Sequence, residues 1–328
     1  MDVSPSRIEL ATLPTPLVRA PRLERALASG PLYVKRDDLI GFAVAGNKTR
    51  ALEFLLGAAV AEGSDILVAA GSPSSNFCAA AAVAARAVGL DCDLLFSPQP
   101  SPQPSTQPSV NVALAGAAGA RLCFDAVATR EELDDAVLAH ADVLRAQGRR
   151  PYAIPRGGAT PTGALGYAYA ARELAEQCEH AGIAPRTVLV ATGSGGTQAG
   201  LVAGQVGFGL PWLVIGASVS RPVQDMAGQI LGLSRACAVK LGLAMPGSGD
   251  IDIRDLRGAG FGVASDEDRV SADLALHHEG LLLDDHYGTK AMTLLRTLLI
   301  EGTPTPAVLW HTGGVVAALA ALTQGATA

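Results

Sequence analysis

The stretch TVLVATGSGGTQAGLVAGQVG, residues 187–207, decides the fold of this chain. Residues 187–192 form a short aliphatic run without polar alternation, which predicts a strand buried on both faces of a sheet. Glycines follow it, and a helical pattern begins at Thr197. Such a turn lets backbone N–H groups converge at the positive end of a helix. The stretch therefore predicts an anion site, most often for phosphate, with a plain strand–helix turn as the alternative.

The same strand–helix alternation continues outward in both directions. Further aliphatic runs predict short buried strands at residues 66–70, 91–96, 121–124, 212–218 and 307–310. Ala- and Leu-rich segments predict helices at residues 48–62, 77–88, 111–118, 130–147, 163–179, 197–207, 266–279, 288–299 and 313–322. This alternation favours an α/β protein with parallel sheets covered by helices.

Composition excludes several classes of protein. The 328 residues carry 25 Lys and Arg against 31 Asp and Glu, and 49% are hydrophobic, which is unlike a disordered chain or a nucleic-acid binder. The five cysteines lack disulfide-scaffold or metal-ligand spacing, so we expect no metal site. Residues 187–220 are uncharged but are broken by glycines and Pro211, so we expect no membrane partner. The length suggests about two domains.

The motif GNKTR, residues 46–50, places a lysine after a glycine-containing turn and at the start of a predicted helix. The chain has only four lysines, so lysine chemistry has few candidates: Lys35, Lys48, Lys240 and Lys290. The field of the helix N-terminus and the charge of Arg50 disfavour a protonated Lys48. A neutral amine is what Schiff-base chemistry requires. The alternative for Lys48 is a solvated surface lysine.

Three further turns follow or precede predicted elements. GSPSSN, residues 71–76, presents hydroxyls and helix N-terminal amides at a strand end, which would suit a substrate carboxylate; a helix cap by Ser75 or Asn76 is the alternative. HTGG, residues 311–314, places a Thr hydroxyl at another strand end. Such a hydroxyl can donate to a neutral ring nitrogen of a bound ligand without imposing a charge. Tyr287 precedes a helix and is a candidate acid or base.

Together these motifs resemble the pyridoxal-phosphate enzymes of fold type II, and within them the D-cysteine desulfhydrase and 1-aminocyclopropane-1-carboxylate deaminase family. The resemblance covers nearly the whole chain and the motifs keep the family's order. They are LPTPL (13–17), VKRDD (34–38), GNKTR (46–50), SN (75–76), IPRGG (154–158), GALGY (163–167), the glycine loop, LD (283–284) with Tyr287, KAM (290–292) and HTGG (311–314).

The resemblance implies an α/β fold of two open, twisted, mostly parallel sheets flanked by helices, similar to the tryptophan synthase β subunit. A large domain of residues 1–47 and 157–328 would bind pyridoxal 5'-phosphate, and residues 48–156 would form a small domain. A cytoplasmic homodimer is also implied.

The family's roles transfer to matching positions of this chain. The implied catalytic residues are Lys48, which forms the Schiff base and moves the Cα proton, and Ser75 and Tyr287. The implied cofactor contacts are Lys48, Asn76 at the phenolic oxygen, Gly193, Ser194, Gly195, Gly196 and Thr197 at the phosphate, and Thr312 at the pyridine nitrogen. The implied substrate contacts are Ser74, Ser75, Asn76, Phe77, Phe261 and Tyr287.

The implied function is a pyridoxal-phosphate-dependent lyase or deaminase acting on a small amino acid. Cα deprotonation and β-elimination from D-cysteine, or from a related β- or S-substituted amino acid, would give a keto acid and ammonia. The alternatives are a racemase, a β-replacement enzyme, or a degenerate homologue that binds ligand without turnover.

The chain departs from the family pattern at several positions. Ala51 stands in place of a lysine near the phosphate, Ser74 in place of Gln, Phe77 in place of a polar residue, Phe261 in place of a tyrosine, and Gly288 in place of the Glu of cyclopropane deaminases. Ring opening is therefore not expected. The two phenylalanines predict a more apolar pocket, suited to a larger or S-substituted leaving group.

Overall fold

The computed structural model describes residues 5–97, 109–124, 129 and 132–325. The chain divides into two compact units. Unit 1 contains Met1–Ala11 and Lys48–Gly163, and unit 2 contains Thr12–Asn47 and Ala164–Ala328. This division differs from the predicted domains at two places, because residues 1–11 and 157–163 group with unit 1 rather than with the large domain.

Long-range contacts explain both differences. The backbone N–H groups of Leu10 and Ala11 each donate to Oε1 of Glu53 at 2.8 Å, which ties the N-terminal segment to unit 1. Gly158 has a φ of +68°, and a Cβ there would lie 2.6 Å from the ring of Phe77. Neither contact is visible in local sequence patterns, because the partners lie more than 40 residues apart.

Unit 2 is built on a six-stranded sheet in which only the first strand is antiparallel. Its order is β1 (Leu17–Arg19), β2 (Leu32–Arg36), β10 (Ala307–His311), β7 (Thr187–Thr192), β8 (Leu213–Ser218) and β9 (Asp252–Asp255). Because β10, β7 and β8 are parallel neighbours, the segments that follow them lie at the same edge of the sheet.

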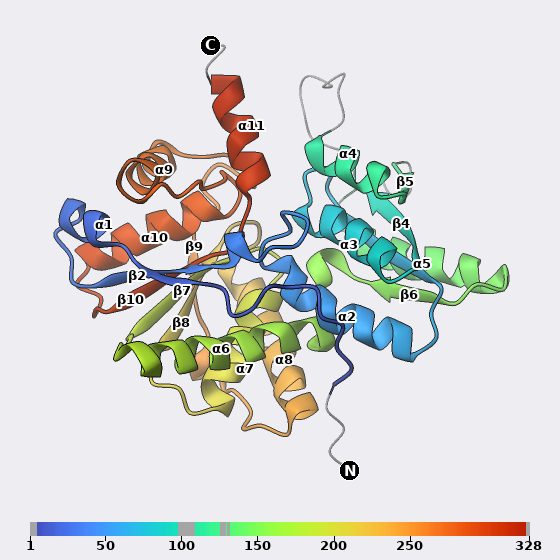
Figure 1. Cartoon of the computed structure of the whole chain (residues 1–328), viewed down its shortest axis with the longest axis horizontal. Helices are drawn as coiled ribbons and strands as arrows, with labels where there is room; N and C mark the ends of the chain where they lie inside the picture. The colour runs from blue at the N-terminus through green and yellow to red at the C-terminus, as the bar shows by residue number, and fades with distance from the viewer. Residues whose placement is uncertain (1–4, 98–108, 125–128, 130–131, 326–328) are drawn as a thin grey trace. The chain divides into compact units, whose positions relative to one another are not determined.

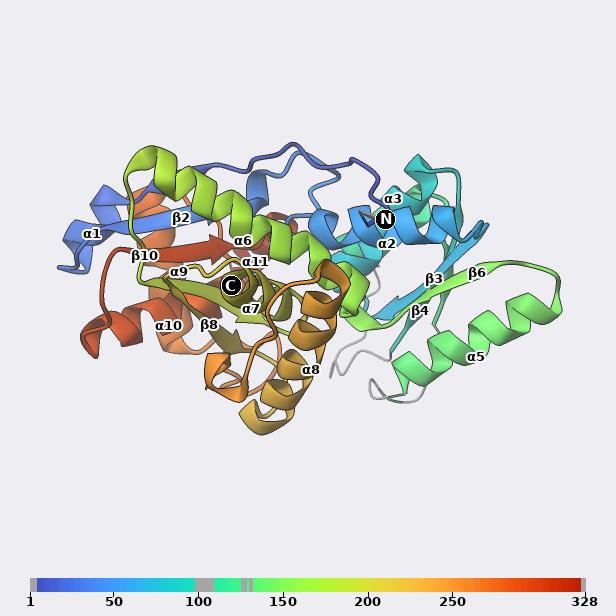
Figure 2. The same ribbon diagram turned by 90° about the horizontal axis from the view of Figure 1, so that it is seen from below.

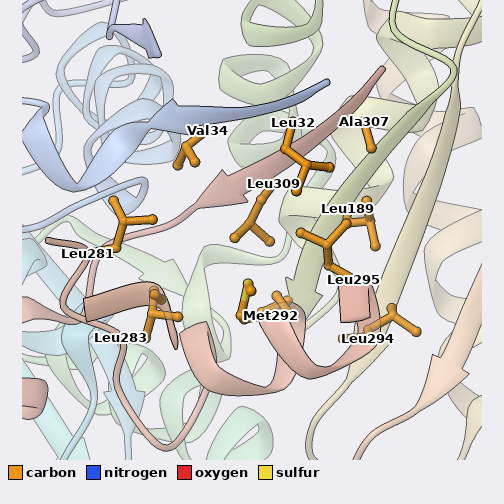
Figure 3. Close-up of a cluster of buried hydrophobic side chains, with 14 of the residues drawn as sticks. Leu32, Val34, Leu189, Leu281, Leu283, Met292, Leu294, Leu295, Ala307 and Leu309 are labelled. Carbon is orange, nitrogen blue, oxygen red and sulfur yellow. The ribbon is translucent and has the colours of Figure 1, made fainter. Parts of the chain in front are cut away.

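Helices cover both faces of this sheet (Figures 1 and 2). One face carries α10 (Gly288–Ile300), with α9 (Asp266–Glu279) and α1 (Pro21–Ala26) beside it; the other carries α6 (Pro161–Ala181), α7 (Gly196–Gly207) and α8 (Val223–Leu241). Figure 3 shows Leu32, Leu189 and Leu309 of the sheet pointing toward Met292, Leu294 and Leu295 of α10. This buried cluster fixes α10, and with it the turn at Tyr287, on the sheet. The last helix, α11 (Val315–Gly325), follows β10.

Unit 1 has a four-stranded parallel sheet in the order β5 (Arg121–Cys123), β4 (Asp91–Phe96), β3 (Ile66–Gly71) and β6 (Pro151–Ile154). Helix α5 (Leu133–Ala146) packs on one face through Leu133 and Val137. Helices α2 (Lys48–Ala61) and α3 (Asn76–Ala87) lie on the other face (Figure 2). Helix α4 (Val110–Ala117) packs on α3 (Figure 1).

The predicted fold class is confirmed: two mostly parallel sheets are flanked by helices. Each predicted strand and helix corresponds to an element of the structure. The Pro- and Gln-rich tract at 98–108, which reads as an extended loop, lies outside the described residues. Within the described residues, no helix is both long and apolar enough to cross a membrane.

Candidate active site

The glycine loop follows β7 and leads directly into α7. Gly195 adopts a left-handed φ of +87° at the helix N-cap. Two of the loop carbonyls are held by neighbouring side chains: Ser220 Oγ donates to Gly193 O at 3.2 Å, and Gln229 Nε2 donates to Ser194 O at 2.9 Å. In the described part of the chain, no hydrogen bond is donated by the backbone N–H groups of residues 193–197. The loop is therefore fixed through its carbonyls, while its donors are left unused.

These donors fit the phosphate of pyridoxal phosphate. Gly195, Gly196 and Thr197 are buried, and a buried N–H without an acceptor costs about 1–3 kcal/mol. An anion at the helix N-terminus would satisfy the donors and would also be favoured by the helix dipole. The local geometry of the loop is compatible with a phosphate contact, which stays a prediction.

Two predicted substrate residues meet beside this loop. A Cβ at Gly193 would lie 2.9 Å from Cε1 of Tyr287, so the glycine lets the tyrosine ring approach the loop backbone. The Phe261 ring lies 5.7 Å from the Tyr287 ring in an edge arrangement, and 5.0 Å from the His286 ring. The sequence patterns assign no role to His286, and its position next to Tyr287 is the only local signal.

The Thr312 turn begins where β10 ends. The N–H of Asn47 donates to the carbonyl oxygen of Thr312 at 2.9 Å. Gly46 has a φ of +57°, and a Cβ there would lie 2.3 Å from the same oxygen. The turn is therefore packed against the residues that immediately precede Lys48.

His311 precedes this turn and is buried, with 2% of its surface exposed. Among the described residues its Nε2 makes no hydrogen bond, and Asp38 Oδ2 is 3.7 Å away. The N–H of Gly313 donates to its Nδ1 at 3.4 Å. Burial lowers the pKa of His311, so the ring is neutral at neutral pH. His311 therefore adds no positive charge to the Thr312 turn. An uncharged turn is compatible with the predicted contact between Thr312 and the pyridine nitrogen.

Asp284 supports the turn that presents Tyr287. Its carboxylate accepts from the N–H groups of Gly288 at 3.0 Å and His286 at 3.2 Å. Burial raises the pKa of this carboxyl group. A Cβ at Gly314 would lie 2.5 Å from Asp284 Oδ1, so Asp284 also lies against the turn after Thr312.

In unit 1, Lys48 is the first residue of α2 and is half-buried. The helix pattern predicted from the GNKTR motif begins at that residue. The next residues are more deeply buried, and Arg50 is 2% exposed. Burial of its neighbours anchors the backbone from which the Lys48 side chain extends.

The turn between β3 and α3 holds the other predicted residues of unit 1. Ser75 caps α3, because its Oγ accepts from the N–H of Cys78 at 3.2 Å, as the helix-cap alternative predicted. A hydroxyl that accepts keeps its own proton for another partner, so the cap leaves Ser75 able to donate. Asn111 Nδ2 donates to Ser74 O at 2.8 Å and to Asn76 Oδ1 at 3.0 Å. The Nδ2 group of Asn76 is not used in this bond and can donate to another acceptor. A contact to the phenolic oxygen of the cofactor requires such a donor.

Phe77 is placed differently from its neighbours. Ser74, Ser75 and Asn76 are partly exposed, whereas Phe77 is 2% exposed and lies against Gly158 and Leu55 in unit 1. This burial favours a packing role for Phe77 over direct contact with a substrate. The predicted residues are thus gathered in two sets, one in each unit. Within the described residues, no group of three or more His, Cys, Asp or Glu is arranged to hold a metal ion.

Comparison with known proteins gives consistent results. A family model described as "Pyridoxal-phosphate dependent enzyme" matches residues 8–313. D-cysteine desulfhydrases of Salmonella paratyphi B and Salmonella newport are each 36% identical over 329 aligned residues, which cover 96% of this chain and 95% of theirs. The crystal structure of an ACC deaminase homologue matches with a TM-score of 0.88 and 31% identity, over 98% of this chain and 96% of that one.

Proposed function

This chain belongs to the pyridoxal-phosphate-dependent enzymes, and we propose that it is a lyase that eliminates the β-substituent of a small amino acid, with D-cysteine as the reference substrate. The observation that carries the proposal is the glycine loop, whose unused N–H groups lie beside Tyr287 at the end of β7. Similarity to D-cysteine desulfhydrases over nearly the full length supports the reaction type.

The residues assigned to the cofactor have matching chemistry. The N–H groups of residues 193–197 and the Thr197 hydroxyl would hold the phosphate. Lys48 would bind the cofactor covalently, Asn76 would donate to its phenolic oxygen, and Thr312 would donate to its ring nitrogen. The donor polarity of Asn76 and the neutrality of His311 beside Thr312 support the last two assignments.

The bound cofactor would supply an electron sink for the substrate's Cα. The substrate's amine would displace Lys48 from the cofactor, and the freed Lys48 amine would then take the Cα proton as a general base. Ser75 and the N-terminal amides of α3 hold the substrate carboxylate, which the helix dipole favours. Tyr287 donates a proton to the departing β-substituent, so that D-cysteine would release hydrogen sulfide. The remaining unsaturated amine reacts with water to give a keto acid and ammonia.

Phe261 supports a substrate with an apolar leaving group. It packs edge-on against Tyr287 and carries no hydroxyl of its own. We therefore propose that S-alkyl cysteines are turned over as well as D-cysteine. Assays of keto acid and ammonia release would compare D-cysteine, L-cysteine, cysteate, 1-aminocyclopropane-1-carboxylate and S-alkyl cysteines. Activity confined to D-cysteine would contradict the apolar pocket, and activity on none of them would contradict the lyase.

The same assays separate the alternatives when they are run in deuterated water. Release of keto acid supports elimination. Deuterium incorporation at Cα without keto acid would instead indicate a racemase, and incorporation of an added thiol would indicate β-replacement. Binding of cofactor without any of these reactions would indicate a degenerate homologue. A cytoplasmic homodimer remains part of the proposal on family membership alone.

A further inference from the structure

Asn47, the residue before Lys48, is held by three hydrogen bonds within unit 2. Its N–H donates to Thr312 O at 2.9 Å, and its carbonyl oxygen accepts from the Tyr167 hydroxyl at 3.0 Å. Its side-chain Nδ2 donates to Thr197 Oγ1 at 3.1 Å. Asn47 is 3% exposed. One buried residue thus connects the glycine-loop helix α7, helix α6 and the turn after β10 through bonds that all lie within unit 2.

The side-chain bond sets the polarity of the Thr197 hydroxyl. A hydroxyl has one proton to donate, and Thr197 uses its oxygen to accept from Asn47. Its proton must therefore find a different acceptor, and among the described residues no bond donated by Thr197 is present. Thr197 follows directly on Gly196, whose N–H is one of the unused donors of the loop. An anion at the loop would supply the acceptor that the Thr197 proton lacks.

The backbone bonds of Asn47 restrict Lys48. Consecutive Cα atoms are about 3.8 Å apart across a trans peptide. Both the N–H and the carbonyl oxygen of Asn47 are bonded, so the backbone that leads into Lys48 is held at Asn47.

We propose that Asn47 is a positioning residue for the cofactor. Its amide makes the Thr197 hydroxyl a donor toward the phosphate, and its backbone bonds anchor the residue that immediately precedes Lys48. The inference rests on the proposed function and adds a residue to which no role was assigned from the sequence.

The test compares the affinities of Asn47→Leu and wild type for pyridoxal phosphate and for pyridoxal, which lacks the phosphate. Leucine matches the size of asparagine and keeps both backbone bonds, but it cannot donate to Thr197. Binding is followed by visible absorption. We expect Kd for pyridoxal phosphate to rise about two- to tenfold, the usual effect of one lost hydrogen bond, and Kd for pyridoxal to stay within about twofold. Gln205→Leu, an amide on the same helix away from the loop, should change neither value.

A double-mutant cycle shows whether Asn47 acts through Thr197. Thr197→Val should weaken pyridoxal phosphate binding about ten- to a hundredfold, and Thr197→Ser should restore it. Adding Asn47→Leu to Thr197→Val should cause no further loss. Equal weakening of both compounds by Asn47→Leu, or two losses that simply multiply, would overturn the inference. If Asn47→Leu does not fold, Asn47→Ala carries the same predictions.

The outcome also separates this inference from the proposed function. A wild-type protein that binds neither compound would overturn the proposed function and this inference together. The inference alone would be overturned if the wild type binds pyridoxal phosphate and the Asn47→Leu variant binds both compounds with wild-type affinity.

Discussion

Gly46 occupies a position where the carbonyl of Thr312 leaves no room for a side chain. Its φ is +57°, and a Cβ would lie 2.3 Å from that oxygen. The close approach is what allows Asn47, one residue later, to bond the same carbonyl. At the scale of single residues, the site thus depends on an absent side chain as much as on the polar ones.

Gly46→Ala should therefore be damaging. Left-handed backbone costs an alanine about 1–2 kcal/mol, and the overlap with Thr312 adds to it, so we expect a loss of about 2–4 kcal/mol in the free energy of unfolding. Gly63→Ala is the matched control, because Gly63 has a φ of +70° with nothing within 4 Å and should lose only the backbone cost. Urea unfolding measures both variants. Equal losses would show that the contact with Thr312 is unimportant.

His311 predicts a pH dependence of stability. Burial lowers its pKa in the folded protein below the usual 6.5, so the unfolded chain binds the proton more tightly. Its contribution to stability is therefore complete at higher pH and is lost as the pH falls through and below about 6.5. We expect His311→Asn, whose amide oxygen can still accept from Gly313, to flatten the fall in unfolding free energy between about pH 7.5 and 5.5. Exposed His180→Asn should not change that slope, and an unchanged slope in His311→Asn would refute the prediction.

At the scale of elements, α7 depends on glycines for its packing against α6. A Cβ at Gly200 would lie 2.2 Å from Ala164 O, and one at Gly204 would lie 2.7 Å from Ala168 O. The two helix backbones therefore approach more closely than side chains would permit. Because α7 begins at the glycine loop, the close packing of α7 against α6 also stabilises the position of the loop.

Gly200→Ala tests this packing. Alanine normally stabilises a helix interior by about 1 kcal/mol relative to glycine, but overpacking costs about 1–3 kcal/mol. We expect a net destabilisation at Gly200. The control is Gly232→Ala in α8, where nothing lies within 4 Å and the substitution should stabilise the protein by about 0.5–1 kcal/mol. Thermal unfolding of the two variants should shift in opposite directions; shifts of the same sign would contradict the close packing.

Elements with strong local signals could be predicted from the sequence. Helix α9 spans the predicted residues, since Ser265 and Asp268 form a capping box and Gly280 ends the helix at a φ of +66°. Helix α8 was missed because two interior glycines and several polar residues mask its apolar stripe. Met226, Ile230 and Cys237 recur at helical spacing and are buried, so a signal was present.

Strand β2 shows a second limit of prediction from the sequence. Its residues include Lys35, which the sequence presents as part of a charge cluster. In the structure Lys35 is fully buried and its Nζ bonds to Glu173 and Gln177 on α6. The partners of this charge lie about 140 residues away in the chain, so the sequence alone does not show which groups neutralise it.

At the scale of the whole molecule, the positions of the glycine loop, the Ser75 turn and the Thr312 turn could be predicted, because each turn follows a strand. The residues that orient them could not. Asn47 and Asn111 bond to groups that come from other elements, so their contribution depends on tertiary contacts. Phe77 illustrates the reverse case, since a residue predicted to contact the substrate is buried in the core.

The central claim is that this chain carries pyridoxal phosphate on Lys48. The visible absorption spectrum of the purified protein, with pyridoxal phosphate added, tests it directly in the wild type, in Lys48→Ala and in the control Lys240→Ala, whose lysine is exposed. We predict a yellow band for the wild type and for Lys240→Ala, and its loss in Lys48→Ala. A band that persists in Lys48→Ala, or that disappears only when Lys35, Lys240 or Lys290 is replaced, would contradict the account.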